Sequence, residues 1–130
     1  MIINGAPIRF HTRARIELMA PARFLFGKQI MSAETADTPA RRLYLAHQAA
    51  YIGTDEERMR GLKHARALTA ACKAASPSAL ARDVLDRALS AAEADQCYTA
   101  LKLAREIIRH EDVVLGRAPA NSQERAPWVA

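Results

Sequence analysis

Few side chains in this sequence have the types and spacing that catalysis requires. The four histidines are His11, His47, His64 and His110. No two of them have the spacing of a helical metal-ligand pair, and a solvated helix end accounts for Glu111 and Asp112, which follow His110. The sequence contains neither a glycine-rich phosphate loop nor a nucleophile elbow. We therefore predict no catalytic residue, no metal site and no cofactor, and we do not expect an enzyme.

The two cysteines, Cys72 and Cys97, each lie in an apolar helical pattern. We expect both to be free thiols that pack as small apolar residues, because no CxxC or Cys/His cluster is present to bind zinc. Arginines interrupt any apolar signal segment, and no apolar run approaches the roughly 18 residues needed to span a bilayer. The sequence therefore predicts a cytoplasmic protein.

Charge points to binding. The net charge is +5, and residues 1–31 hold five basic residues against one acid, Glu17. The basic residues are Arg9, Arg13, Arg15, Arg23 and Lys28. This excess favours an acidic partner, which charge alone leaves open as RNA, DNA, an anionic membrane or an acidic protein. The alternative is a modest positive charge with no polyanionic partner.

A second basic pair stands at a predicted helix start. Thr38, followed by a proline, is typical of an N-cap, so a helix is expected from about residue 39. Arg41 and Arg42 then lie at the positive end of the helix dipole, where a cation costs about 0.3 kcal/mol or more unless a partner compensates it. This cost makes them candidates for an interaction. The alternative is that they form ion pairs with Glu34 or Asp37.

The N-terminal residues are predicted to form a small antiparallel sheet. Segments rich in β-formers, separated by turn signals, occupy residues 1–3, 8–10, 14–18 and 23–26. Asn4-Gly5 is a strong two-residue turn signal. Apolar and basic residues alternate in these segments, so we expect one apolar and one cationic face, with Phe10 and Phe24 in the core beneath the sheet.

Four amphipathic helices are expected after a polar connector. The first ends near Gly53 in a left-handed conformation, and the second begins with a capping box of Thr54 and Glu57 and runs to about residue 75. Ser76 followed by a proline is the predicted start of the third helix, and Asp95 is the predicted cap of a fourth that ends at Gly116. The short linkers predict antiparallel neighbours in an up-and-down bundle.

The predicted fold is α+β and mostly α. A small β-hairpin region spans residues 1–31, an antiparallel four-helix bundle spans residues 38–116, and a flexible tail with Trp128 spans residues 117–130. The expected inward-facing residues are Leu43, Ala46, Ala50, Tyr51, Met59, Leu62, Ala65, Leu68, Cys72, Ala75, Leu80, Val84, Leu85, Ala88, Ala92, Cys97, Leu101, Ala104 and Ile108. Gln48 is expected away from the buried stripe.

Three segments together resemble the FlbT family of alphaproteobacterial flagellum-biosynthesis regulators. They are Asn4-Gly5-Ala6, Thr38-Pro39-Ala40-Arg41-Arg42-Leu43-Tyr44, and the stretch from Tyr98-x-Ala100-Leu101-Lys102 to Glu111-Asp112. The likeness runs from about Ile2 to Gly116. It implies a cytoplasmic post-transcriptional regulator that associates with the 5′ untranslated region of flagellin mRNA and promotes its degradation. It also implies a functional link to flagellin and to the small flagellar protein FlaF.

Two departures from the family pattern bear on the structure. Family members usually begin further upstream with another short strand, and the proline-containing tail is not part of the pattern. If a strand is missing, the sheet has an open edge, which a second copy of the chain or a partner could fill.

Two functional hypotheses follow. In the first, the basic residues bind RNA phosphates, and Phe10 or Tyr44 stacks on an unpaired base. The proposed RNA contacts are Arg9, Arg13, Arg15, Arg23, Lys28, Arg41 and Arg42. Changing Arg41 and Arg42 to Glu is expected to weaken RNA binding and to leave the fold intact.

The second hypothesis is a helical adaptor or chaperone-like protein that binds flagellin or FlaF in a helix-in-groove contact and acts on the mRNA indirectly. Aromatic residues and long cations are favoured at interface centres. The residues proposed for this contact are Tyr44, Tyr51, Tyr98 and Lys102. Ordinary packing is the alternative for all of them.

Overall fold

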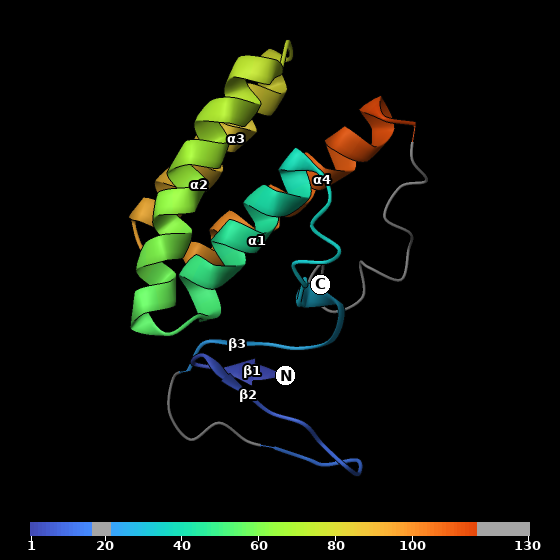
Figure 1. Cartoon of the computed structure of the whole chain (residues 1–130), viewed down its shortest axis with the longest axis vertical. Coiled ribbons are helices and arrows are strands. Elements are labelled where there is room, and N and C mark those ends of the chain that lie inside the picture. Colours follow the sequence, from blue (N-terminus) through green and yellow to red (C-terminus); the bar gives the residue numbers. More distant parts are fainter. Residues whose placement is uncertain (17–21, 117–130) are drawn as a thin grey trace.

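The computed structural model describes residues 1–16 and 22–116 (Figure 1). The predicted flexible tail therefore lies outside the described residues, as do Glu17 and Leu18. The elements in chain order are β1 (Ile2–Ile3), β2 (Ala6–Pro7), β3 (Phe24–Leu25), the 3₁₀ turn η1 (Gly27–Gln29), α1 (Pro39–Ile52), α2 (Asp55–Ala75), α3 (Ala79–Glu93) and α4 (Cys97–Val114). The fold is mostly α with a small antiparallel sheet, which confirms the predicted class. Among the described residues, no helix is both long and apolar enough to span a membrane.

The four helices pack as consecutive antiparallel neighbours, and α1 also packs against α4. Figure 1 shows two pairs of helices, α1 with α4 and α2 with α3, which diverge toward the top of the view. The sheet lies below the other end of the bundle, where the pairs converge. Short connections explain this arrangement, because each helix must turn back beside the one before it.

The sheet has the strand order β2-β1-β3, with β1 antiparallel to both neighbours. Asn4 and Gly5 both have positive φ, as the predicted two-residue turn requires. Arg23 is tied to this turn, because its backbone N–H donates to Asn4 Oδ1 (2.9 Å) and its carbonyl accepts from the Asn4 N–H (2.8 Å). The outer edges of β2 and β3 belong to strands of two residues, and association through an open edge stays a prediction.

Two predicted strands are wrong. Residues 8–16, which we call the arm, form no strand, and the predicted strand at residues 14–18 is likewise absent over its described part. Phe10 is 45% exposed and Ile16 is 48% exposed, so neither lies in a core. Alternation alone did not make a strand here, because a strand also needs a hydrogen-bonding neighbour, and the pairing of this segment with the N-terminus ends at Ile8, which bonds to Met1.

The first two helix starts agree with the sequence. Thr38 Oγ1 accepts from the Arg41 N–H (3.3 Å), and Thr54 forms the predicted reciprocal capping box with Glu57. The end of α1 differs, because Gly53 is extended rather than left-handed. A glycine is still required there, since a Cβ would lie 2.8 Å from the Ala49 carbonyl oxygen and 2.7 Å from the Glu57 Cβ.

The predicted caps of α3 and α4 are wrong. Ser78, not Ser76, caps α3 by accepting from the Ala81 N–H (3.2 Å). Gln96 stands at the N-cap of α4 without a side-chain cap bond, while Asp95 has a φ of 62° and turns its carboxylate toward other partners. The sequence signal misled because a serine or aspartate near a helix start has more than one possible acceptor geometry.

Most of the expected inward-facing residues of α1, α3 and α4 are buried, and Ala65 of α2 is too. Three predictions fail: Met59 is 75% exposed, Leu80 is 72% exposed, and Ala75 is exposed. The face of α2 that is fully buried consists of Gly61, Ala65 and Thr69, spaced four residues apart. Met59 and Gly61 are therefore on different faces, since two residues correspond to more than half a turn. Leu80 and Ala75 lie at the α2–α3 end, where the helix pairs diverge (Figure 1).

Gly61 marks the closest approach of α1 and α2. A Cβ at this position would come within 2.7 Å of the Ala50 backbone nitrogen and 2.8 Å of the Ala46 carbonyl oxygen. Backbone cannot move aside as a flexible side chain can, so only glycine permits this packing.

We predict that Gly61→Ala lowers the free energy of unfolding by about 1–3 kcal/mol, the usual cost of overpacking. This is the opposite sign from the gain expected of Gly→Ala at an exposed helical position. Urea denaturation measures the difference, with Lys63→Ala, an exposed change two residues away, as the control. A Gly61→Ala variant as stable as wild type would show that the two helices can separate without cost.

His47 is the most completely buried ionisable ring of the described chain. It is 0% exposed, and neither ring nitrogen has a hydrogen-bond partner among the described residues. Burial lowers the pKa of His47 from 6.5 to about 4, because the charged imidazolium is poorly solvated inside the bundle. The neutral ring therefore behaves as a core residue.

This shift makes stability depend on pH. Since the unfolded chain binds a proton at His47 before the folded chain does, stability present above pH 6.5 is lost as the pH falls toward about 4. The loss amounts to about 3 kcal/mol. We predict that His47→Leu flattens this part of the stability-pH curve, whereas His64→Gln at an exposed position does not. Equal slopes in all three proteins, measured by urea denaturation, would contradict the assignment.

Candidate functional site

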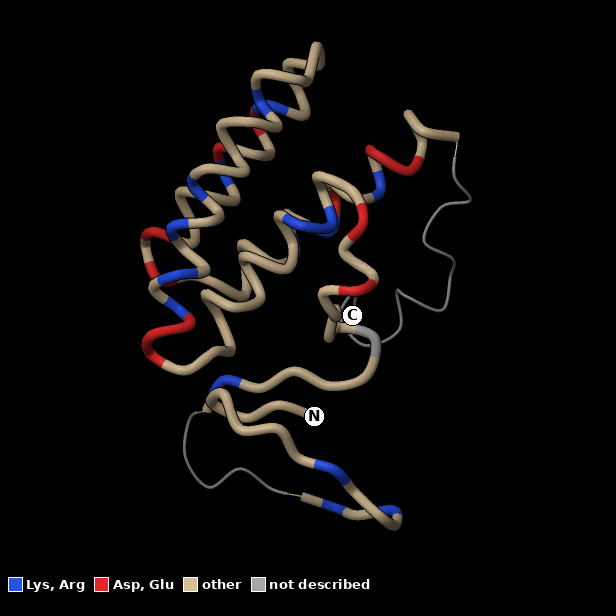
Figure 2. The backbone as a smooth tube through the Cα atoms, viewed as in Figure 1, with Lys and Arg blue, Asp and Glu red and all other residues tan. Residues whose placement is uncertain are grey.

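The arm carries the exposed positive charge of the N-terminal region. Arg9, Arg13 and Arg15 are all exposed, and among the described residues none of them forms an ion pair. Figure 2 shows basic positions without acidic ones along the described arm, whereas the helices carry both signs. Arginines that no described carboxylate neutralises can each donate to a phosphate oxygen.

Two further predicted RNA contacts, Arg42 and Lys28, give weaker support for an RNA-binding surface. Arg42 is exposed, but it lies in the first turn of α1, and Figure 2 places that turn well away from the arm. The structure therefore does not assemble a continuous basic strip from the arm and the first helix. The side chain of Lys28 lies outside the described part of the chain.

Arg41 has a different role from Arg42. Its guanidinium donates to both carboxylate oxygens of Asp112 (2.9 and 3.1 Å) and to Glu111 (3.4 Å). The Arg41 side chain is 17% exposed and that of Asp112 is 0% exposed. The hydrogen bond to Asp112 raises the pKa of Arg41 more than burial lowers it. The two neighbouring arginines thus separate into one structural cation and one surface cation.

The same carboxylates complete the start of α1. Glu111 accepts from the Ala40 N–H (3.0 Å), one of the first-turn donors that has no partner within the helix. The interpretation of Glu111 and Asp112 as a solvated helix end is therefore wrong. Arg41 forms ion pairs, but with Glu111 and Asp112 at the end of α4, while of the two predicted partners Asp37 adds a smaller favourable contribution.

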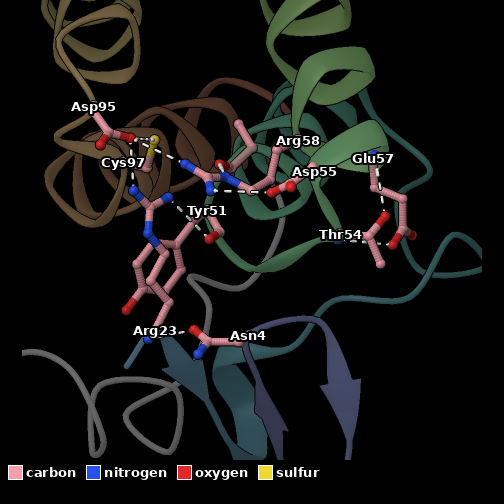
Figure 3. A network of polar contacts seen from close by, with 10 residues as sticks. Asn4, Arg23, Tyr51, Thr54, Asp55, Glu57, Arg58, Asp95 and Cys97 are labelled. Carbon is pink, nitrogen blue, oxygen red and sulfur yellow. Dashed lines mark hydrogen bonds and ion pairs between the residues drawn. The ribbon is translucent and has the colours of Figure 1, made fainter. Parts of the chain in front are cut away.

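Arg23 is also engaged inside the molecule. It donates to Asp95 (2.7 Å) and to the Tyr51 carbonyl (3.2 Å), and Arg58 donates to the same Asp95 oxygen from α2 (3.2 Å), as Figure 3 shows. The hydrogen bond from Arg23 is the main cause that lowers the pKa of Asp95. These hydrogen bonds to Asp95 join the strand region to the α3–α4 turn. They leave Arg23 less available to RNA than the arginines of the arm.

The four residues proposed for a protein partner do not form one surface. Tyr44 is 1% exposed and its hydroxyl donates to the Gln29 carbonyl (2.8 Å), so its proposed role in partner binding is wrong. Its burial also excludes the suggested stacking on a base. Tyr51 and Tyr98 are half-buried and in contact, with ring centroids 5.6 Å apart, and the exposed Lys102 ammonium lies 5.4 Å from the Tyr98 centroid.

Beside these two tyrosines is a surface hollow that the sequence did not reveal. It is lined by Phe24, Phe26, Gln29, Tyr51 and Tyr98 and has a volume of about 350 Å³. The alternation of Phe24 and Phe26 is the one sequence signal for it, because residues two apart on an extended segment share a face. The predicted place of Phe24 in the core beneath the sheet is wrong, because Phe24 is only half-buried and Phe26 beside it is 43% exposed.

Comparison with known proteins decides the family. The family model described as "Flagellar protein FlbT" matches residues 1–115. This chain belongs to the FlbT family. "Probable flagellum biosynthesis repressor protein FlbT" of Mesorhizobium japonicum is 32% identical over 117 residues, which is 88% of this chain and 77% of that protein.

Two relatives from Bradyrhizobium diazoefficiens give the same result. "Probable flagellum biosynthesis repressor protein FlbT 2" is 32% identical over 87% of this chain and 82% of its own. "Probable flagellum biosynthesis repressor protein FlbT 1" is 30% identical over 92% of this chain and 81% of its own. No solved structure matches the chain.

The structure explains how two of the segments that resemble FlbT depend on each other. The segment that contains Arg41 opens α1, the segment that contains Glu111 and Asp112 closes α4, and the ion pairs described above connect them. In this FlbT chain the two segments therefore have a shared structural purpose. The sequence did carry a signal for this contact, since one segment is basic and the other is acidic. The signal was missed because a solvated helix end offered a simpler local explanation of the acidic pair.

We predict that Arg41→Ala lowers the free energy of unfolding by about 3–5 kcal/mol, because it leaves the buried Asp112 carboxylate without its cation. Arg42→Ala, at an exposed position one residue away, should change it by no more than about 0.5 kcal/mol. The structure thus removes the basis for expecting Arg41→Glu to leave the fold intact. Urea denaturation of both variants makes the comparison, and equal stabilities would contradict it.

Proposed function

We propose that this chain is a cytoplasmic post-transcriptional regulator of flagellum biogenesis. It binds the 5′ untranslated region of flagellin mRNA and promotes degradation of that mRNA. The names of its relatives, each a probable flagellum biosynthesis repressor, support the repressor role. Membership of the FlbT family supports the link to flagella.

The observation that carries the RNA-binding part is the arm. Phosphate binding needs cations that are exposed and not already neutralised, and Arg9, Arg13 and Arg15 meet both conditions within the described residues. Arg42 supplies a further exposed cation on the bundle. In this proposal the chain acts by binding, and a cellular ribonuclease carries out the degradation.

The alternative is an adaptor that binds flagellin or FlaF and acts on the mRNA indirectly. A specific observation favours it: an open pocket of about 320 Å³ between α1, α2 and the α3–α4 turn includes Met59 and Leu62. Met59 is 75% exposed, so a large apolar side chain in the lining of this pocket is accessible to a partner. Tyr51, Tyr98 and Lys102 would belong to a second contact of this kind.

The test of the RNA proposal is a variant with Arg9, Arg13 and Arg15 all changed to Ala. We predict that its affinity for a flagellin leader RNA falls and that the dependence of log K on log salt becomes shallower by about 2, since each single-strand phosphate contact contributes about 0.7. Fluorescence anisotropy across a salt series measures both quantities. A scrambled RNA of the same length, which should bind less tightly to wild type, tests whether the leader is preferred.

The matched control removes three exposed cations from the helices, in the variant Arg60→Ala, Lys63→Ala, Arg87→Ala. Both triple variants lose the same net charge, so an arm-specific effect is separated from a general electrostatic one. Equal losses in the two variants would remove the arm from the site. Wild-type protein that binds purified flagellin firmly and neither RNA would favour the adaptor.

A further inference from the structure

The aromatic hollow beside β3 has the composition of a stacking site. Phe24 and Phe26 have nearly parallel rings, with an interplanar angle of 7° and centroids 6.1 Å apart. Tyr51 and Tyr98 also line the hollow, and their rings make a tilted contact. Four rings around one hollow are unusual in a chain whose aromatic content is 5%.

The lining of the hollow contains polar groups as well. Gln29 is 3% exposed, its Nε2 donates to the Tyr98 hydroxyl (3.2 Å), and its Oε1 accepts from the Phe26 N–H (3.4 Å). These bonds hold the amide and the phenol in place in the lining of the hollow. A planar ligand with hydrogen-bonding edges suits such a lining better than an aliphatic side chain does.

Positive charge flanks the rings. The Arg23 guanidinium lies 5.6 Å from the Tyr51 centroid, and the Lys102 ammonium lies 5.4 Å from the Tyr98 centroid. Lys102 is exposed, so its ammonium can also meet a phosphate next to the hollow. The charge therefore complements a ligand that is anionic outside the hollow and aromatic inside it.

The arm and the hollow lie on opposite edges of one narrow sheet. The arm follows β2, the hollow includes β3, and only β1 separates these strands. The outer strands β2 and β3 are about 10 Å apart, so a short run of nucleotides can reach from the start of the arm to the hollow. We propose that the hollow lined by Phe24, Phe26, Gln29, Tyr51 and Tyr98 takes one unpaired base of an RNA whose phosphates are held by the arm. This inference rests on the proposed RNA binding and adds a base-reading site to it.

The experiment compares a short single-stranded RNA of mixed sequence with the same RNA made abasic at its internal positions. The two carry the same phosphates, so their affinity ratio reports only the bases. Wild-type protein should bind the intact RNA about tenfold more tightly, as expected for one stacked base. Phe26→Leu keeps an apolar side chain but removes the ring, and it should bring that ratio close to one.

Two further variants make the result specific. Phe26→Trp keeps an aromatic face and should retain the affinity ratio. Retention in Phe26→Trp with loss in Phe26→Leu requires an aromatic ring, because neither a loss of folding nor a simple apolar contact predicts that difference. Phe10→Leu removes a ring of similar exposure from the arm and should leave the ratio unchanged. If Phe10→Leu abolishes the ratio and Phe26→Leu does not, the base site is on the arm and the inference is overturned.

The outcomes separate this inference from the proposal on which it rests. If neither RNA binds wild type, the proposed RNA binding itself fails. If both bind with equal affinity, the arm holds phosphates and the hollow takes no base. If the ratio is present and persists in Phe26→Leu, a base is read elsewhere. A ratio that is lost in Phe26→Leu and kept in Phe26→Trp and Phe10→Leu supports the assignment.

Discussion

The buried ion pair between Arg41 and Asp112 is the constraint on which the rest of the structure depends. It is made between the first turn of α1 and the last turn of α4, so it fixes the start of α1 beside the end of the antiparallel α4. Because Asp112 is fully buried, removal of the guanidinium would leave an unpaired charge inside the bundle. Glu111 strengthens the same junction by capping the free N–H of Ala40.

The N-terminal region is organised by contacts that originate on the positioned α1 helix. Tyr44 holds the Gln29 carbonyl, and Gln48 makes two hydrogen bonds to the backbone of Met31 (2.8 and 3.0 Å). Gln48 is consequently buried, contrary to the expectation that it faces away from the core. Leu25 is 0% exposed and belongs to the main core cluster. The division at residue 31 stays a prediction, although β3 already takes part in the core of the bundle.

This arrangement explains why the arginines near the N-terminus differ in availability. Arg23 directly precedes β3, and its side chain reaches Asp95 of the bundle, whereas the arm leaves β2 without a buried apolar residue between positions 8 and 16. A segment without such an anchor stays on the surface, because nothing offsets the desolvation of its charged groups. Packing, and not residue type, thus determines which basic residues remain exposed.

The sequence by itself determined the helical elements and much of their packing. Periodicity located the four helices and the inward row Cys97, Leu101, Ala104 and Ile108, and the caps at Thr38 and Thr54 were readable because capping involves residues close in sequence. It also supplied the FlbT resemblance, and it identified both cysteines as free. These features depend on local backbone geometry and on composition, which need no knowledge of distant contacts.

Only the tertiary structure decided which charged and aromatic residues are available for binding. Arg41 and Arg42 are adjacent and identical in type, yet one is paired with a carboxylate 71 positions away and the other is exposed. Tyr44 entered the core, Asp95 became an ion-pair partner instead of a cap, and Phe24 and Phe26 joined Tyr51 and Tyr98 around one hollow. Local propensity cannot resolve such cases, because the free energy of each side chain depends on partners that are brought near it only when the chain folds.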